Sequence, residues 1–126
     1  MASPALEPSA AHVEETTLDG VALFVLGGEF DAFSSPPLRQ QLIDAIERGS
    51  HELVLDMSAV TFVDMSTLNA IVDALKLVYQ HNGHLVVTTT SPPVLRAIDL
   101  AGFRHAIRVY PTRAEALVGV RERPQH

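Results

Sequence analysis

The chain has 126 residues, with 15 acidic and 9 basic side chains for a formal charge of −6, and it contains no cysteine. This length allows one compact domain, and the 47% hydrophobic content is typical of a globular protein. A negative charge without a Lys/Arg cluster argues against direct nucleic-acid binding. The lack of cysteine excludes disulfides and fits a reducing compartment, so we expect a cytoplasmic protein.

The first expected elements are two strands joined by a tight turn. Residues 12–17 are a strand candidate, and Asp-Gly at 19–20 is typical of a hairpin turn. Residues 21–26 are continuously apolar, as in a strand covered on both faces. The Ser-Ser-Pro-Pro run at 34–37 then predicts a helix start with a hydroxyl cap, and Gly49 is expected to end this helix.

After this helix, strands and helices alternate along the chain. The strands are expected at 52–56, 85–89 and 106–110, and the helices at 66–81, 91–102 and 112–120, the last one capped by Thr112 with Glu115. The alternation predicts a single α/β domain with about four helices and a mostly parallel sheet that begins with an antiparallel hairpin. We place this domain at 12–120, between tails at 1–11 and 121–126.

Several classes of chemistry find no support in the sequence. The longest apolar stretch is too short to span a bilayer, and no phosphate-binding glycine pattern is present. His81 and His84 have metal-compatible spacing, but they flank a helix stop and lack a nearby third ligand, so no metal site is predicted. A nucleophilic Ser66 would lack a base and an oxyanion site. We therefore predict no catalytic residue, no bound cofactor and no enzymatic activity.

Polar side chains concentrate where one predicted strand leads into the best predicted helix. Asp64, Ser66 and Thr67 lie there, and a helix N-terminus favours an anion such as a phosphorylated side chain. The alternative is that one of them simply caps the helix. A cap does not account for Asp31, which ends the neighbouring strand unit. Both carboxylates are expected at the same edge of the sheet, where α/β proteins present their binding crevices.

Six short motifs follow one another in a characteristic order. They are Gly-Glu-Phe-Asp at 28–31, Leu-Val-Leu-Asp at 53–56, Val-Thr-Phe-Val-Asp-Met-Ser at 60–66, Asn-Gly-His-Leu at 82–85, Ser-Pro-Pro-Val at 91–94 and Leu-Ala-Gly-Phe at 100–103. Together they resemble the STAS domain of bacterial anti-sigma factor antagonists, over about residues 12–120. The resemblance implies a protein that binds a serine-kinase anti-sigma factor and frees a sigma factor. In the family, phosphorylation of a serine at the start of the second helix breaks the complex.

The chain departs from the family at the phosphoacceptor. The family run is Asp-Ser-Ser-Gly-Leu, and residues 64–68 are Asp-Met-Ser-Thr-Leu, so Met65 occupies the usual acceptor position. Ser66 and Thr67 remain as candidate acceptors. A rotation of about 100° per residue predicts that Ser66 is exposed and that Thr67 turns partly toward the core. The expected partner-binding residues are Asp31, Asp64, Met65, Ser66 and Asn69.

Two further interpretations remain open at this point. The missing acceptor is compatible with a STAS scaffold that works without phosphorylation. The second interpretation is a STAS module that holds a small ligand or a lipid in a crevice beside the sheet.

Overall fold

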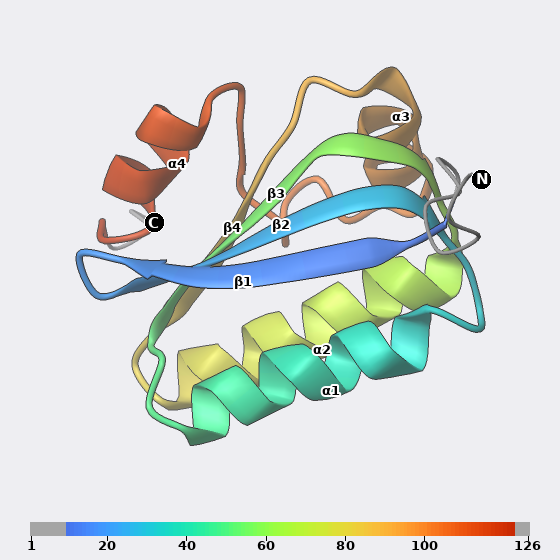
Figure 1. The fold of residues 1–126 in the computed structure, drawn as a ribbon. Coiled ribbons are helices and arrows are strands. Elements are labelled where there is room, and N and C mark those ends of the chain that lie inside the picture. The colour runs from blue at the N-terminus through green and yellow to red at the C-terminus, as the bar shows by residue number, and fades with distance from the viewer. Residues whose placement is uncertain (1–9, 123–126) are drawn as a thin grey trace, which may run out of the picture.

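A five-stranded sheet in the order β1-β2-β3-β4-β5 organises the computed structural model, which describes residues 10–122 (Figure 1). The strands are β1 (His12–Leu18), β2 (Val21–Phe30), β3 (Glu52–Val63), β4 (His84–Thr88) and β5 (Val109–Tyr110). The helices are α1 (Ser35–Glu47), α2 (Met65–Gln80), α3 (Pro92–Leu100) and α4 (Arg113–Gly119). β1 pairs antiparallel with β2, and the other strand pairs are parallel. The predicted fold class is confirmed. Residues 1–9 and 123–126 of the expected tails lie outside the described residues.

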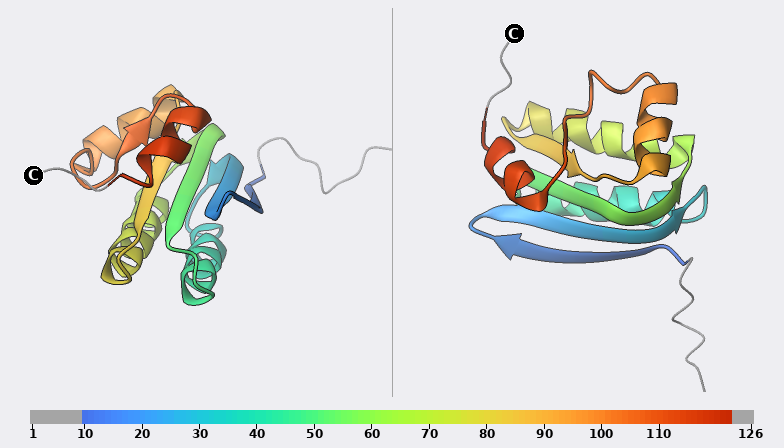
Figure 2. Two further views of the ribbon diagram at one scale, coloured as in Figure 1. Left: turned by 90° about the vertical axis from the view of Figure 1, so that its left-hand side faces the viewer. Right: turned by 90° about the horizontal axis from the view of Figure 1, so that it is seen from above.

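Helices cover both faces of the sheet. α1 and α2 lie side by side on one face, and α3 and α4 lie on the other side at opposite ends of β3 (Figure 2). Because successive strand residues point to opposite faces, Leu53 and Leu55 pack in the larger core, while Val54 packs with Ala116 of α4 and with Val120 just after it. The central strands are therefore apolar at consecutive positions, as predicted for 21–26.

The predicted hairpin turn is present between β1 and β2. Asp19 and Gly20 both have positive φ, 51° and 84°. This backbone matches the twist of antiparallel strands and costs glycine little, which explains why the Asp-Gly pair identified the turn.

β2 and β3 extend beyond their predicted ends, to Phe30 and Val63. The strand predicted at 21–26 stops just before the Gly27-Gly28 pair. In the structure this pair lies inside β2, and the register with β3 shifts on both sides of it. At each shift the extra residue lies in β3, and β2 continues through the two glycines to Phe30. Glycine tolerates such irregular pairing. Because β3 continues to Val63, only Asp64 separates it from α2, where a loop was expected.

The last strand is shorter than predicted. β5 comprises only Val109–Tyr110, whereas the prediction placed a strand at 106–110. The backbone N–H groups of Ala106 and Ile107 donate to the carbonyl of Phe103, and so they close a turn. Local turn hydrogen bonds therefore replace the start of the expected strand.

The helix caps agree only in part with the prediction. Thr112 caps α4 by accepting a hydrogen bond from the Glu115 N–H, as predicted. The predicted hydroxyl cap of α1 is wrong, because Ser34 makes no side-chain cap bond. The Asp31 carboxylate instead accepts from the N–H groups of Phe33 and Ser34. A carboxylate four residues ahead of the helix thus takes the place of the hydroxyl.

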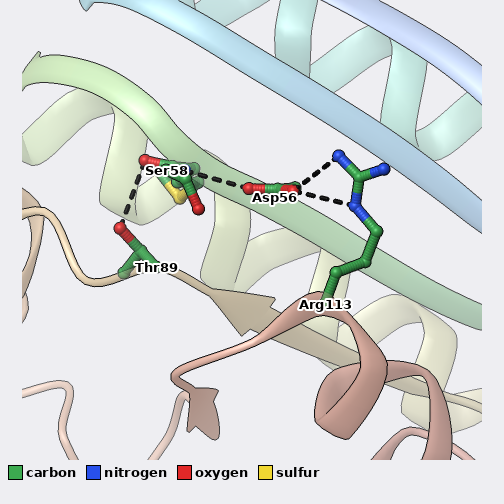
Figure 3. A network of polar contacts seen from close by, with 5 residues as sticks. Asp56, Ser58, Thr89 and Arg113 are labelled. Carbon is green, nitrogen blue, oxygen red and sulfur yellow. Dashed lines mark hydrogen bonds and ion pairs between the residues drawn. The ribbon is translucent and has the colours of Figure 1, made fainter.

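A buried carboxylate connects β3 to α4 (Figure 3). Asp56 is 7% exposed and accepts two hydrogen bonds from Arg113, at 2.7 and 3.0 Å, and one from the Ser58 N–H. Burial alone would raise the pKa of Asp56, but the hydrogen bonds from Ser58 and Arg113 outweigh it and hold the pKa below 3.8. Close by, Thr89 donates to the carbonyl of Met57.

Helix length and composition also bear on membrane insertion. Within residues 10–122, none of the helices combines the length and the apolar character that a bilayer crossing requires.

Replacing Asp56 by Asn should lower the free energy of unfolding at neutral pH by about 1–2 kcal/mol, because the charge-assisted hydrogen bonding with Arg113 is lost. The loss stays moderate because Arg113 is half exposed, so water can solvate its charge in the variant. The pKa of Asp56 is lowered by folding, so its contribution is present above about pH 4 and is lost as the pH falls through the folded value. Urea unfolding between about pH 7 and pH 2 measures both effects. Between neutral and acid pH, Asp56→Asn should lose less stability than the wild type.

Asp99→Asn is the matched control, because the ion pair of Asp99 with Arg104 is more than half exposed on both sides. It should change stability by less than about 1 kcal/mol. Equal effects of the two substitutions would contradict a stabilising role of the buried pair.

Candidate functional site

The ends of β2 and β3 bring two carboxylates to one edge of the sheet. Phe30 pairs with Val63, and the backbone N–H of Asp64 donates to the carbonyl of Phe30 at 3.2 Å. Asp31 and Asp64 follow directly on the two paired strand ends. Their charges interact, since Asp64 acts to raise the pKa of Asp31. The structure thus brings together the two residues that the sequence placed at this edge.

Asp31 organises the turn between β2 and α1. Its Oδ1 accepts from the N–H groups of Phe33 and Ser34 at 3.0 and 3.1 Å, and from the Ser34 hydroxyl at 3.2 Å. The two backbone hydrogen bonds are the main reason that the pKa of Asp31 lies below its ordinary value. This exposed carboxylate is therefore ionised at neutral pH and held in a fixed turn.

Asp64 is both the N-cap of α2 and a charge at the edge. Its Oδ1 accepts from the Ser66 hydroxyl at 2.6 Å, the Thr67 N–H at 3.1 Å and the Thr67 hydroxyl at 3.3 Å. Partial burial acts to raise the pKa of Asp64, but these hydrogen bonds lower it below the ordinary value. The cap interpretation is therefore confirmed, and the same carboxylate also carries a charge at this edge of the sheet.

A serine of α1 connects the two acidic segments. The hydroxyl of Ser35 donates to the Asp31 carbonyl at 2.6 Å. It also lies 2.8 Å from the Ser66 hydroxyl and 2.7 Å from the Thr67 hydroxyl. Ser35 is buried, and sequence reasoning treated it only as part of a helix start. Its role depends on a helix packed against the first turn of another, which no local pattern reveals.

The candidate acceptors are less accessible than the helical rotation predicted. Thr67 is fully buried, and Ser66 is half-buried, so the prediction that Ser66 is exposed is wrong. The helical rotation predicts exposure for a helix that packs on the sheet alone. In the structure α1 also packs beside α2, and the Ser35 hydroxyl lies 2.8 Å from the Ser66 hydroxyl. Met65 is 49% exposed and Asn69 is exposed. Of the candidates near the helix start, Met65 and Asn69 present the freest side chains.

Two aromatic side chains at this edge were missed by the sequence analysis. Phe33 is 91% exposed and Phe62 is 48% exposed, and each lies two residues from Asp31 or Asp64 in the chain. Together with Met65 they make the surroundings of the carboxylates apolar. We call Asp31, Phe33, Phe62, Asp64 and Met65 together the acidic edge. A phenylalanine in an otherwise small and polar segment, as at residues 31–35, was the available signal. Exposed apolar groups beside charges are typical of a protein-binding surface.

The histidines do not gather at this edge or elsewhere as metal ligands. Within residues 10–122, no group of three His, Cys, Asp or Glu side chains is placed to hold a metal ion. The His81 ring stacks on His51, and the His84 ring lies beside Tyr79, each pair with ring centroids 6.5 Å apart.

Comparison with known proteins assigns the chain to a family. A model of the STAS domain matches residues 12–116. The anti-sigma F factor antagonist of Paenibacillus polymyxa is 34% identical over 99 residues, which are 78% of this chain and 85% of that protein. An anti-sigma factor antagonist from Mycobacterium paratuberculosis has a similar structure, with a TM-score of 0.77 and 28% identity over 92% of this chain and 98% of its own.

A third relative has been solved in a phosphorylated form. The Bacillus cell fate determinant SpoIIAA aligns with a TM-score of 0.67 and 19% identity, covering 89% of this chain and 100% of its own, which shows a likeness of fold. The family model spans most of the chain, and the fold agrees with it throughout the described residues. The protein therefore belongs to the STAS domain family.

Proposed function

We propose that this protein is an anti-sigma factor antagonist, which binds an anti-sigma factor of the serine-kinase type and so frees a sigma factor. The observation that carries the proposal is the 34% identity with the antagonist of P. polymyxa over most of both chains. The protein acts by binding and not by catalysis, and it works in the cytoplasm. It holds no cofactor of its own, since ATP would belong to the partner kinase.

The acidic edge supplies the docking surface in this proposal. Asp31 and Asp64 present ionised carboxylates whose positions are fixed by hydrogen bonds, and fixed charges favour the correct partner and orientation. Phe33, Phe62 and Met65 provide exposed apolar area beside these charges. Large apolar side chains surrounded by polar groups commonly carry most of the energy of an interface.

Phosphorylation would oppose binding at this edge. A phosphoryl group adds about −1.5 to −2 charges, which would stand next to Asp64 and close to Asp31. Met65 offers no hydroxyl, Thr67 is buried, and the Ser66 hydroxyl is engaged with Asp64 and Ser35. We therefore propose that modification of Ser66 or Thr67 is slow or absent, and that the antagonist is active by default.

Removing either edge carboxylate should weaken binding to the anti-sigma factor by about tenfold, about 1.4 kcal/mol. Asp31→Ala deletes one charge, and Asp64→Ser deletes the other while keeping an oxygen that can cap α2. Titration calorimetry of each variant with serine-kinase-type anti-sigma factors from the same bacterium measures the affinity. Thermal unfolding confirms that each variant is folded at the temperature used.

Asp73→Ala is the matched control for these variants. Asp73 is an exposed carboxylate of α2, and among the described residues its one ion pair is with Arg39, at 3.3 Å. Its loss should leave the affinity within about twofold, since exposed pairs of this kind contribute little. Equal losses for Asp73→Ala and the two edge variants would move the interface away from the acidic edge.

Met65→Ser should restore rapid phosphorylation, because it returns a hydroxyl to an exposed position at the start of α2. The wild type, Met65→Ser and Met65→Ala are incubated with the partner kinase and ATP, and the phosphopeptides are mapped by mass spectrometry. Met65→Ala removes the thioether without adding a hydroxyl, so it should remain unmodified like the wild type. Rapid, stoichiometric phosphorylation of wild-type Ser66 would overturn activity by default and would support a phosphorylation switch.

A further inference from the structure

A network of three hydroxyl groups lies beneath the acidic edge. Ser35 contributes one from α1, and Ser66 and Thr67 contribute the others from the first turn of α2. Within residues 10–122, every side-chain hydrogen bond between residues 31–35 and residues 64–67 involves Ser35. The backbone bond from Asp64 N–H to the Phe30 carbonyl is the other connection. Among the described residues, Ser35 is thus the side chain that hydrogen-bonds the Asp31 turn to the first turn of α2.

Each hydroxyl has one proton, and this limits the arrangements that the network can adopt. The Ser66 proton goes to Asp64 Oδ1, at 2.6 Å. The Thr67 hydroxyl can donate to Ser35, at 2.7 Å, or to Asp64 Oδ1, at 3.3 Å, and the shorter distance favours Ser35. Ser35 then donates either to the Asp31 carbonyl or to Ser66. In both arrangements with Thr67 donating to Ser35, the Ser66 hydroxyl still donates to Asp64, and Ser35 accepts one hydrogen bond and donates one. The buried hydroxyl of Ser35 is therefore fully used and joins both segments.

We propose that Ser35 is a positioning residue for partner binding, which fixes the Asp31 turn relative to the first turn of α2 and so sets the arrangement of the two carboxylates. The inference rests on the proposed function and adds to it a residue that lies outside the contact surface. Ser35 is 4% exposed, so its hydroxyl acts through Asp31, Ser66 and Thr67 and not by touching a partner.

Ser35→Ala is a clean test because the remaining groups keep partners. The Asp31 carbonyl still accepts from the backbone N–H of residue 35, at 3.0 Å. Thr67 can donate to Asp64 Oδ1, which is 3.3 Å away, and Ser66 already does so. No buried donor is stranded, so the variant is expected to fold. The variant loses the side-chain hydrogen bonding between residue 35 and the first turn of α2.

Ser91→Ala is the matched control. Ser91 directly precedes α3, whereas Ser35 is the first residue of α1, so both lie at a helix start. The Ser91 hydroxyl donates to another element, at 2.9 Å to the Val60 carbonyl of β3. Its hydrogen bonds reach neither Asp31 nor Asp64. The two variants therefore remove the same group, and with it a cross-element bond, at different places in the fold.

The experiment combines calorimetry with the anti-sigma factor, thermal unfolding, and amide exchange of the free protein followed by NMR. Ser35→Ala should bind about threefold to tenfold more weakly, the equivalent of one lost hydrogen bond. Its amide exchange should become faster at residues 31–35 and at residues 64–68 together. Ser91→Ala should lose similar thermal stability and bind like the wild type.

Three results would overturn the proposal. They are wild-type affinity of folded Ser35→Ala, an equal loss of affinity in Ser91→Ala, and exchange that is unchanged in either acidic segment. Failure of the proposed function has a different signature, since the wild type itself would then bind no anti-sigma factor. In that case the exchange of the free Ser35→Ala variant decides on its own whether Ser35 couples the two segments.

Discussion

The parallel pairing of β2 with β3 up to their last residues is the constraint on which the surface features of this protein depend. Since Phe30 and Val63 are paired, the residues that follow them must leave the sheet side by side. The carboxylates that follow the two strands, Asp31 and Asp64, therefore lie at the same edge of the sheet. The helices α1 and α2 also begin close to each other and pack side by side on one face (Figure 1). The irregular register around Gly27 and Gly28 is what lets β2 reach this point.

Electrostatic repulsion at such an edge has to be offset locally. Two carboxylates at neighbouring strand ends would disfavour each other's ionised form. Each one is instead supplied with its own donors: backbone N–H groups for Asp31, and hydroxyl and N–H groups of the first α2 turn for Asp64. The pKa values of both groups consequently lie below the ordinary value. Within residues 10–122 no ion pair involves Asp31 or Asp64, so these hydrogen bonds hold the negative charge of the edge.

The fold and the two carboxylates could be predicted from the sequence because local signals reported them. The Asp-Gly turn, the apolar run at 21–26 and the helical spacing of α2 each reflect backbone chemistry within a few residues. Ser35 could not be recognised, since its partners lie 31 and 32 positions away in the chain. For the same reason Ser66 was expected to be exposed: the packing of α1 beside α2 is a property of the tertiary structure.

The double use of Asp64 restricts which residues evolution can accept at that position. Asn and Ser would still accept the Thr67 N–H and cap the helix, but they would remove the charge. Glu would keep the charge, but its longer side chain is not among the preferred caps. Aspartate is therefore the residue that supplies both the charge and a preferred cap here, whereas the carboxylate of Asp73 makes an exposed ion pair with Arg39 and caps no helix.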